Sequence, residues 1–362
     1  MQTNFKYLLV SLFLLFSLSS LSQKATEKFV VVLDAGHGGH DPGRPTKFET
    51  EKKIALNIAL KIGNKLEKYN NIEVIYTRKK DVFVELHERA AIANRADADL
   101  FVSIHCNAWS TNQPYGTETY VLSVGNTDRN MDVAKAENEV IFLEDDHEKN
   151  YEGYDPNSPE SIIGLTLLQE DYTEQSIILA RMVEDNFMHK LKRKSRGVKQ
   201  ISLWVMHNTY MPSVLIETGF LTNKKEGKYI SSNIGQEEIS ESISESILKY
   251  IETVSADTDL AIITNSSQNS QSNSVDITFK VQIAAGARKL ETKPYNFNGL
   301  RGVSSESIGN GYKYFYGDTS NYNTIKKYKE EALEKGYTSS FIVAYKNGKR
   351  INISDALKTI SN

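Results

Sequence analysis

The stretch Phe29-Val-Val-Val-Leu-Asp34 decides the fold of this 362-residue chain. An unbroken apolar run of this length predicts a strand buried on both faces, as in the parallel sheets of α/β proteins. Further strands are predicted at 72–77, 100–104, 118–122 and 213–216, and helices after Thr50 and near 84–96, 174–194 and 235–253. This alternation predicts an α/β domain over residues 28–254, with a mostly parallel sheet flanked by helices.

A polar, low-complexity segment separates this domain from a second one. Residues 264–274 contain only Thr, Asn, Ser and Gln and offer nothing to bury, so we expect a flexible linker over 255–274. Short strands are predicted after it at 278–283, 312–316 and 340–345, with a helix near 321–335. Residues 275–362 are therefore predicted to form a small α+β domain.

The charge of the chain is nearly balanced. It has 43 Lys+Arg against 46 Asp+Glu, a net charge of -3 at pH 7. Such a balance provides no field strong enough to hold a polyanion, and we expect no nucleic-acid partner.

The N-terminal residues have the pattern of a secretory signal peptide. Lys6 precedes an apolar and small-residue run from Tyr7 to Leu21, and the small residues Ser20 and Ser22 suit a signal peptidase. The alternative is an uncleaved membrane anchor, but the run is shorter than the roughly 20 apolar residues that a spanning helix needs. We predict a signal peptide over 1–22, cleaved near Ser22, and an exported protein of the periplasm or cell envelope.

Three predicted strands end in a residue that could bind a metal or move a proton. His37 follows the first strand, His105 ends the strand at 100–104, and Glu217 follows the strand at 213–216. Ligand crevices of open α/β sheets lie outside the carboxyl ends of the strands, so these side chains converge if the strands are parallel neighbours.

Each candidate also has an ordinary structural interpretation. His37 suits a hydrogen-bonded turn between glycines, and His105 suits a satisfied core histidine. Glu51 opens a predicted helix, where the helix dipole favours a carboxylate, and Glu217 suits a solvated strand end. Two neutral imidazoles and one carboxylate are nevertheless typical of a catalytic zinc site with a fourth position for water. After a buried apolar run, desolvation raises the pKa of a carboxyl group such as Glu217 toward the range useful for proton transfer.

These residues lie in motifs that resemble the zinc-dependent N-acetylmuramoyl-L-alanine amidases of the type 3 family. The motifs are Val31-Val-Leu-Asp-Ala-Gly-His-Gly-Gly-His-Asp-Pro-Gly43, Glu51-Lys52, Thr77-Arg78, Glu88-Arg-Ala-Ala-Ile-Ala-Asn94, Ala98-Asp-Leu-Phe-Val-Ser-Ile-His-Cys-Asn-Ala108 and Pro212-Ser-Val-Leu-Ile-Glu-Thr-Gly-Phe-Leu-Thr-Asn223. The resemblance implies one Zn²⁺ per catalytic domain, held by His37, Glu51 and His105. It also implies that Glu217 is the catalytic glutamate.

The reaction implied by the resemblance is cleavage of peptidoglycan. The bond is the amide between the lactyl group of N-acetylmuramic acid and L-alanine of the stem peptide. Zinc would polarise the carbonyl and lower the pKa of water toward about 7. Glu217 would take the proton of that water and pass it to the leaving amine.

The segment 126–172 is longer than a strand-to-helix connection needs and is rich in acidic residues. A solvated acidic insertion is the plain interpretation. Similar amidases cover the zinc with an inserted helix whose glutamate occupies the water position until an activator protein removes it. By this resemblance Glu144 is the candidate regulatory residue.

The tail resembles a SPOR domain through Phe279-Lys-Val-Gln-Ile-Ala284, Tyr312-Lys-Tyr-Phe-Tyr-Gly317 and Gly336-Tyr-Thr-Ser-Ser-Phe-Ile-Val-Ala344. This family implies binding to glycan strands without stem peptides, enriched at division sites. Strand alternation places Gln282, Lys313 and Phe315 on the sheet face away from the helices. These three residues are candidate sugar contacts, with an ordinary sheet surface as the alternative.

Two other classes of function remain open from the sequence. One is a non-catalytic wall-binding scaffold, although no ligand or base is missing. The other is a zinc exopeptidase of similar fold, which would cut peptide termini instead of the glycan–peptide junction.

Overall fold

The computed structural model describes residues 28–44, 47–122, 128–145, 147, 159–266, 277–286, 289–308, 311–337, 340–351 and 353–360, so the predicted signal peptide lies outside them. The elements of the first domain are β1 (Phe29–Ala35), α2 (Glu51–Leu66), β2 (Ile72–Tyr76), α3 (Leu86–Arg95), β3 (Leu100–Asn107), β4 (Thr117–Leu122), α4 (Asp128–Asn138), the 3-10 helix η2 (Glu139–Leu143), α6 (Pro159–His189), β5 (Ser195–Ile201), α7 (Trp204–His207), β6 (Ser213–Phe220), α8 (Lys224–Ile230) and α9 (Asn233–Ser266).

The strands of this domain form one six-stranded sheet in the order β2-β1-β3-β6-β4-β5. From β2 to β6 all neighbours are parallel. β4 runs antiparallel to β6, and β5, which the apolar pattern did not predict, pairs in parallel with β4. The predicted mostly parallel α/β sheet is therefore confirmed, with β1, β3 and β6 as adjacent strands.

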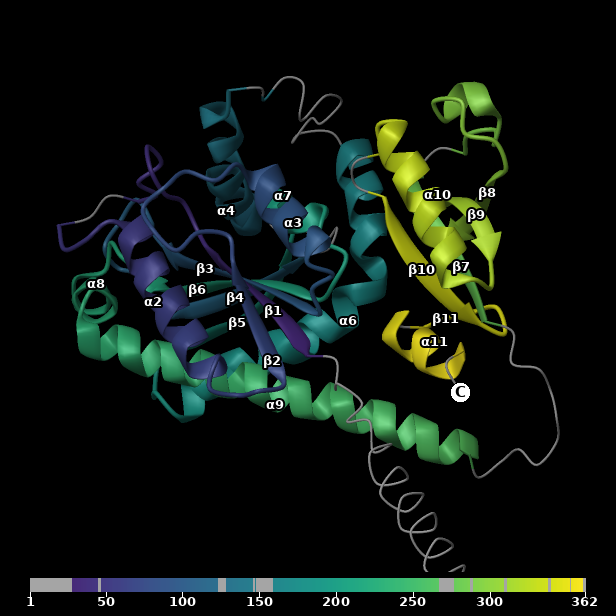
Figure 1. Ribbon diagram of the computed structural model, residues 1–362. Coiled ribbons are helices and arrows are strands. Elements are labelled where there is room, and N and C mark those ends of the chain that lie inside the picture. Colours follow the sequence, from purple (N-terminus) through teal and green to yellow (C-terminus); the bar gives the residue numbers. More distant parts are fainter. Residues whose placement is uncertain are drawn as a thin grey trace, which may run out of the picture.

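Helices cover both faces of the sheet (Figure 1). Val31 and Leu33 face the layer formed by α2, α6 and α9, whereas Val32, between them, faces α3, α4 and α7. Four apolar residues of α2 recur at every fourth position, so they form one face of the helix, and all four are fully buried: Ile54, Ile58, Ile62 and Leu66. Burial of both sheet faces explains why these strands are apolar throughout.

The second domain is an antiparallel five-stranded sheet with helices on one face. Its elements are β7 (Ile277–Gly286), the 3-10 helix η3 (Pro294–Asn296), β8 (Val303–Ile308), β9 (Gly311–Thr319), α10 (Tyr322–Glu334), β10 (Phe341–Lys346), β11 (Lys349–Ile351) and α11 (Ile353–Ile360). The strand order is β11-β10-β7-β9-β8. Val281 and Ile283 pack with Ile325 of α10 in the core, as strand alternation predicted.

Two expected boundaries are wrong. α9 continues to Ser266, so the first part of the predicted linker 255–274 is helical; extending an existing helix requires no new nucleation. The segment 126–172 is divided among α4, η2 and the first part of α6, which begins at Pro159 and not near residue 174.

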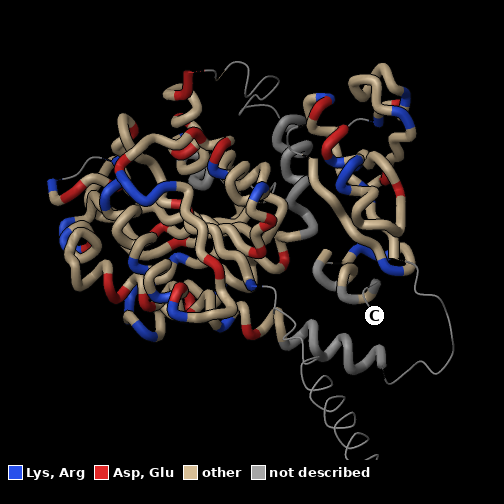
Figure 2. Tube along the Cα trace, in the orientation of Figure 1, with Lys and Arg blue, Asp and Glu red and all other residues tan. Residues whose placement is uncertain are grey.

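Basic and acidic residues are interspersed along the described chain (Figure 2). Among the described residues, no helix combines the length and apolarity needed to cross a membrane.

Candidate metal centre and active site

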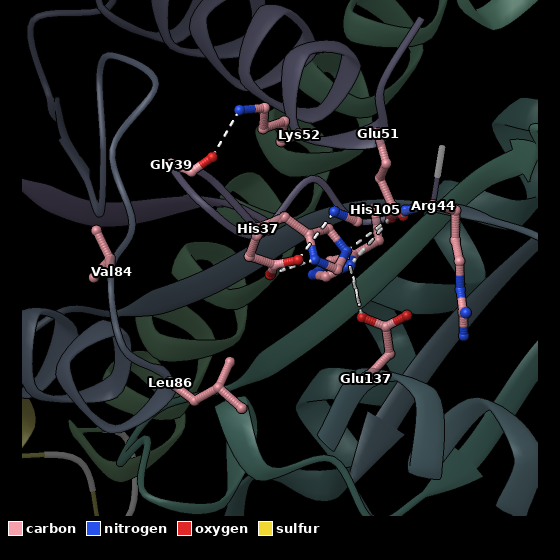
Figure 3. Close-up of polar contacts among 12 residues, drawn as sticks. His37, Gly39, Arg44, Glu51, Lys52, Val84, Leu86, His105 and Glu137 are labelled. Carbon is pink, nitrogen blue, oxygen red and sulfur yellow. Dashed lines mark hydrogen bonds and ion pairs between the residues drawn. The ribbon is translucent and has the colours of Figure 1, made fainter. Parts of the chain in front are cut away.

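The carboxyl ends of β1, β3 and β6 bring the predicted site residues together. His37 lies two residues beyond β1, while His105 of β3 and Glu217 of β6 are direct partners in the parallel register. Glu51, the first residue of α2, is directed at the two histidines (Figure 3). The predicted convergence of His37, His105 and Glu217 is confirmed, and Glu51 lies with them.

His37 is held in a fixed orientation by its neighbours. Its φ angle of 60° lies in the left-handed region, which turns the chain sharply after β1. Gly36 allows the close approach of His105, because a Cβ at Gly36 would lie 2.4 Å from the His105 ring. Nδ1 of His37 lies 2.8 Å from Oδ2 of Asp41. A carboxylate at one ring nitrogen leaves the other, Nε2, as the atom that faces the site.

Glu51 lies between the two imidazoles. Its Oε1 is 3.2 Å from Nε2 of His37 and 3.4 Å from Nδ1 of His105. The backbone N–H of Cys106 donates to Oε1 at 2.8 Å, and that of Arg44 donates to Oε2 at 2.9 Å. These bonds fix a fully buried carboxylate at the N-terminus of a helix.

The ring nitrogens of His37 and His105 and the carboxylate of Glu51 are arranged for binding a metal ion rather than for hydrogen bonds to one another. Nε2 of His37 and Nδ1 of His105 are buried and have no hydrogen-bond partner that satisfies the geometry of such a bond. Buried polar groups are normally paired, so two orphaned ring nitrogens facing one carboxylate need another partner. Two imidazole nitrogens and a carboxylate oxygen are the donor set that Zn²⁺ takes in catalytic sites.

The carboxylates around the site raise the pKa values of both histidines. Burial alone would lower the pKa of His37, but Glu51 and Asp41 outweigh burial and raise it to about 10. Burial likewise opposes the carboxylates at His105, where Glu137 and Glu51 raise the pKa well above 6.5. Burial would raise the pKa of Glu51, yet the two histidines lower it well below 4.5. A cation is therefore favoured at this position.

Glu217 has the opposite electrostatic setting. It is buried, and its Oε2 has no hydrogen-bond partner. Burial, followed by the charge of Glu137, raises the pKa of Glu217 well above 4.5. The pKa of Glu51 is lowered and that of Glu217 is raised. Two carboxyl groups whose environments separate their pKa values in this way commonly have different roles in one site.

Glu137 of α4 is the site residue that the sequence did not single out. Its Oε2 lies 3.0 Å from Nδ1 of His105 and 3.7 Å from Nε2 of His37 (Figure 3). It completes, with the two histidines, a group whose ligand atoms lie within 4.8 Å of one another. The only signal in the sequence was the acidic composition of the inserted segment, which several residues share.

Glu144 does not occupy the water position expected for it, because its carboxylate lies elsewhere. It is buried against the start of α3, where Oε1 accepts the backbone N–H of Leu86 at 2.7 Å and Oε2 lies 3.3 Å from Nδ1 of His87. α4 places Glu137 over the histidines, and η2 then turns the chain away, so that Glu144 reaches α3 instead.

Two buried arginines hold the chain segment from Asp34 to His37 by hydrogen bonds. Arg89 of α3 donates to Oδ1 of Asp34 and to the carbonyls of Ala35 and His37 at 2.7–2.8 Å. Arg78 donates to the carbonyls of Ala35, at 2.9 Å, and Gly36, at 2.7 Å. These bonds satisfy the backbone of a turn that is too irregular to pair within the sheet.

The expected sugar contacts of the second domain share one face of its sheet, but that face is not open. Gln282, Lys313 and Phe315 are each exposed by no more than 2%. Alternation along the strands predicted the shared face correctly. The expectation that this face is accessible is wrong, because α6 of the first domain packs against β7 and β9.

The fold and this site together define the class of α/β enzymes with a buried candidate metal centre at the carboxyl edge of a mostly parallel sheet. Within this class the chain belongs to the Amidase_3 family of N-acetylmuramoyl-L-alanine amidases, whose sequence model matches residues 31–249.

Named relatives carry the same description. The chain is 31% identical over 223 residues to the N-acetylmuramoyl-L-alanine amidase AmiC of Escherichia coli, covering 61% of this chain and 52% of AmiC. It is 29% identical over 233 residues to AmiA of Escherichia coli, covering 63% of this chain and 78% of AmiA. A crystal structure of an N-acetylmuramoyl-L-alanine amidase from Clostridium difficile matches with 28% identity and a TM-score of 0.47, over 62% of this chain and 98% of that one. The chain thus spans about half the length of AmiC.

Proposed function

We propose that this chain hydrolyses peptidoglycan at the amide between the lactyl group of N-acetylmuramic acid and L-alanine. The observation that carries the proposal is the pair of orphaned nitrogens of His37 and His105 facing Glu51, beside the unpaired carboxyl oxygen of Glu217. Membership in the amidase family supports the choice of substrate.

In this proposal His37, Glu51 and His105 hold one Zn²⁺. When bound, zinc supplies Lewis-acid polarisation of the scissile carbonyl and lowers the pKa of water toward about 7. Glu217, with its raised pKa, takes a proton from the attacking water and delivers it to the amine nitrogen of L-alanine as that nitrogen leaves. Asp41 keeps Nε2 of His37 directed at the site, and Arg89 keeps the carbonyl of His37 in place.

Glu137 gives the site a closed state in the same proposal. Its carboxylate lies where substrate or water would approach His37 and His105. Opening requires movement of α4, and an activator protein is a natural agent of that movement.

We further propose that the chain is exported to the periplasm or cell envelope, where its substrate lies. There the second domain, as a SPOR-like module, binds glycan strands, with enrichment at the division site.

The test is Glu217→Gln, which keeps the shape of the side chain but removes its ability to carry the proton. We expect unchanged zinc content and a loss of turnover of about 10²- to 10⁴-fold on purified sacculi. Glu252→Gln, an exposed change on α9, is the matched control and should keep full activity.

Mass spectrometry of the digested sacculi, with and without a chelator, identifies the new ends. Free stem peptides beginning with L-alanine support the amidase. Shortened peptides that are still attached to glycan would identify the chain as an exopeptidase instead. The absence of any released product would identify it as a non-catalytic scaffold. Full activity of Glu217→Gln would remove Glu217 from the mechanism.

A further inference from the structure

A row of side chains on the second sheet has an unusual composition for a domain interface. Phe341 of β10, Gln282 of β7 and Phe315 of β9 are direct partners across three neighbouring strands. Phe315, Phe341, Val343 and Tyr345 form an apolar cluster of their own, separate from the core of the domain. The row therefore places one amide between two aromatic rings.

The first domain covers this row. Tyr210 stacks on Phe341 with ring centroids 3.8 Å apart and planes 19° from parallel. Nη2 of Arg350 donates to the hydroxyl of Tyr172 on α6 at 3.4 Å. α6 lies between the two sheets and contacts both β7 and β9 (Figure 1). The two domains are thus in direct contact through the face that carries Gln282.

The contact leaves one strong polar group unsatisfied. Gln282 is 1% exposed, and neither Nε2 nor Oε1 of its amide has a hydrogen-bond partner. A buried amide without partners carries the full cost of its lost hydration, and an apolar residue of the same size would avoid that cost. In a permanent interface an apolar residue would be more stable than Gln282 at this position. The amide is useful only if a second binding partner forms hydrogen bonds with it.

We propose that this face is a carbohydrate-binding surface closed in the present structure by α6 and Tyr210, so that a glycan strand and the first domain compete for it. The inference rests on the proposed binding of peptide-free glycan by the second domain and adds its regulation. Flat aromatic rings stack on the apolar faces of sugar rings, as Tyr210 stacks on Phe341 here, and the amide of Gln282 pairs with hydroxyl or acetamido groups. The docked chain does not bind glycan, and the glycan-bound chain has its two domains apart.

The competition is tested on the full chain with Tyr210→Ala. This change lies in the first domain and removes a docking contact without altering the sugar-binding face. We expect affinity for peptide-free glycan strands, prepared with an unrelated amidase, to rise about three- to tenfold. Tyr172→Ala, which removes a different docking contact, should act in the same direction. Tyr69→Ala, which removes an exposed tyrosine of the first domain, is the matched control and should bind as the native chain does.

Gln282→Leu gives the opposite result if the proposal is right. It removes the unsatisfied amide, so the docked form becomes more stable, and it removes the hydrogen bonds to sugar, so glycan binding weakens. Small-angle scattering of the native chain should show a larger radius of gyration once glycan is saturating. Equal glycan affinity of Tyr210→Ala, Tyr172→Ala and the native chain, or unchanged scattering, would overturn the competition. An absence of glycan binding in the native chain and in both variants would overturn the proposed glycan binding on which the competition rests. Hydrolysis of sacculi is measured separately, so a failure of competition is distinguishable from a failure of the amidase assignment.

Discussion

At the scale of single residues, the position of a carboxylate matters more than its presence. Glu137 and Glu144 lie on the same short stretch of chain, yet only Glu137 reaches the histidines, while Glu144 ties the stretch to α3. Glu51 and Glu217 are both buried, yet their pKa values move in opposite directions. The two histidines lower the pKa of Glu51 against the effect of burial, whereas burial and the charge of Glu137 raise that of Glu217.

Glu137→Ala should raise the basal hydrolysis of sacculi. The change removes the carboxylate that approaches both candidate metal ligands. Coupling between a regulatory contact and a binding site commonly changes affinity by about 5- to 150-fold, and we expect a change of this size in the rate. Dye release from labelled sacculi measures the rate, and zinc content should stay the same. Glu139→Ala, an exposed change two residues away, should leave the rate unaltered. A rate equal to that of the native chain would show that Glu137 does not close the site.

At the scale of elements, one side chain ties the end of the inserted segment to α3. α3 has no side-chain cap from its own N-cap residue, Glu85, and the carboxylate of Glu144 accepts its first backbone N–H instead. The same bond attaches the end of η2 to the first domain. It therefore also helps to position α4, which precedes η2 and carries Glu137.

Glu144→Ala should loosen this segment without touching the metal ligands. Loss of a helix cap costs about 0.5–2 kcal/mol of stability. We expect faster proteolysis between α4 and α6 together with a higher basal rate of hydrolysis. Asp145→Ala, exposed and adjacent, is the control. Unchanged proteolysis and an unchanged rate would mean that the bond from Leu86 to Glu144 does not hold the segment closed.

At the scale of the whole molecule, packing determines which buried side chains can be protonated. His207 at the end of α7 is fully buried beside Ser202, whose Oγ lies 3.0 Å from Nε2 of His207. Burial lowers the pKa of His207 from 6.5 to about 3. Between these two values the unfolded chain takes up a proton that the folded chain excludes, so stability falls as the pH is lowered.

His207→Gln should flatten this acid dependence, because the amide does not titrate. The native chain should lose about 1.4 kcal/mol per pH unit more than the variant as the pH falls from about 6 to 4. Urea unfolding at several pH values measures the difference. His189→Gln, exposed at the end of α6, should follow the native profile. Parallel profiles for the native chain and His207→Gln would exclude a buried neutral histidine at this position.

The sequence by itself determined the layers of the first domain and the convergence of His37, His105 and Glu217. Apolar runs specify buried strands, and the residues that end parallel neighbours meet at one edge. The sequence also placed Gln282 and Phe315 on one face by their alternation. Only the tertiary structure decided that Glu137 approaches the histidines and that the face of Gln282 is covered. Both outcomes depend on how elements distant along the chain pack together, whereas the spacing of residues within one element records only which side of that element they occupy.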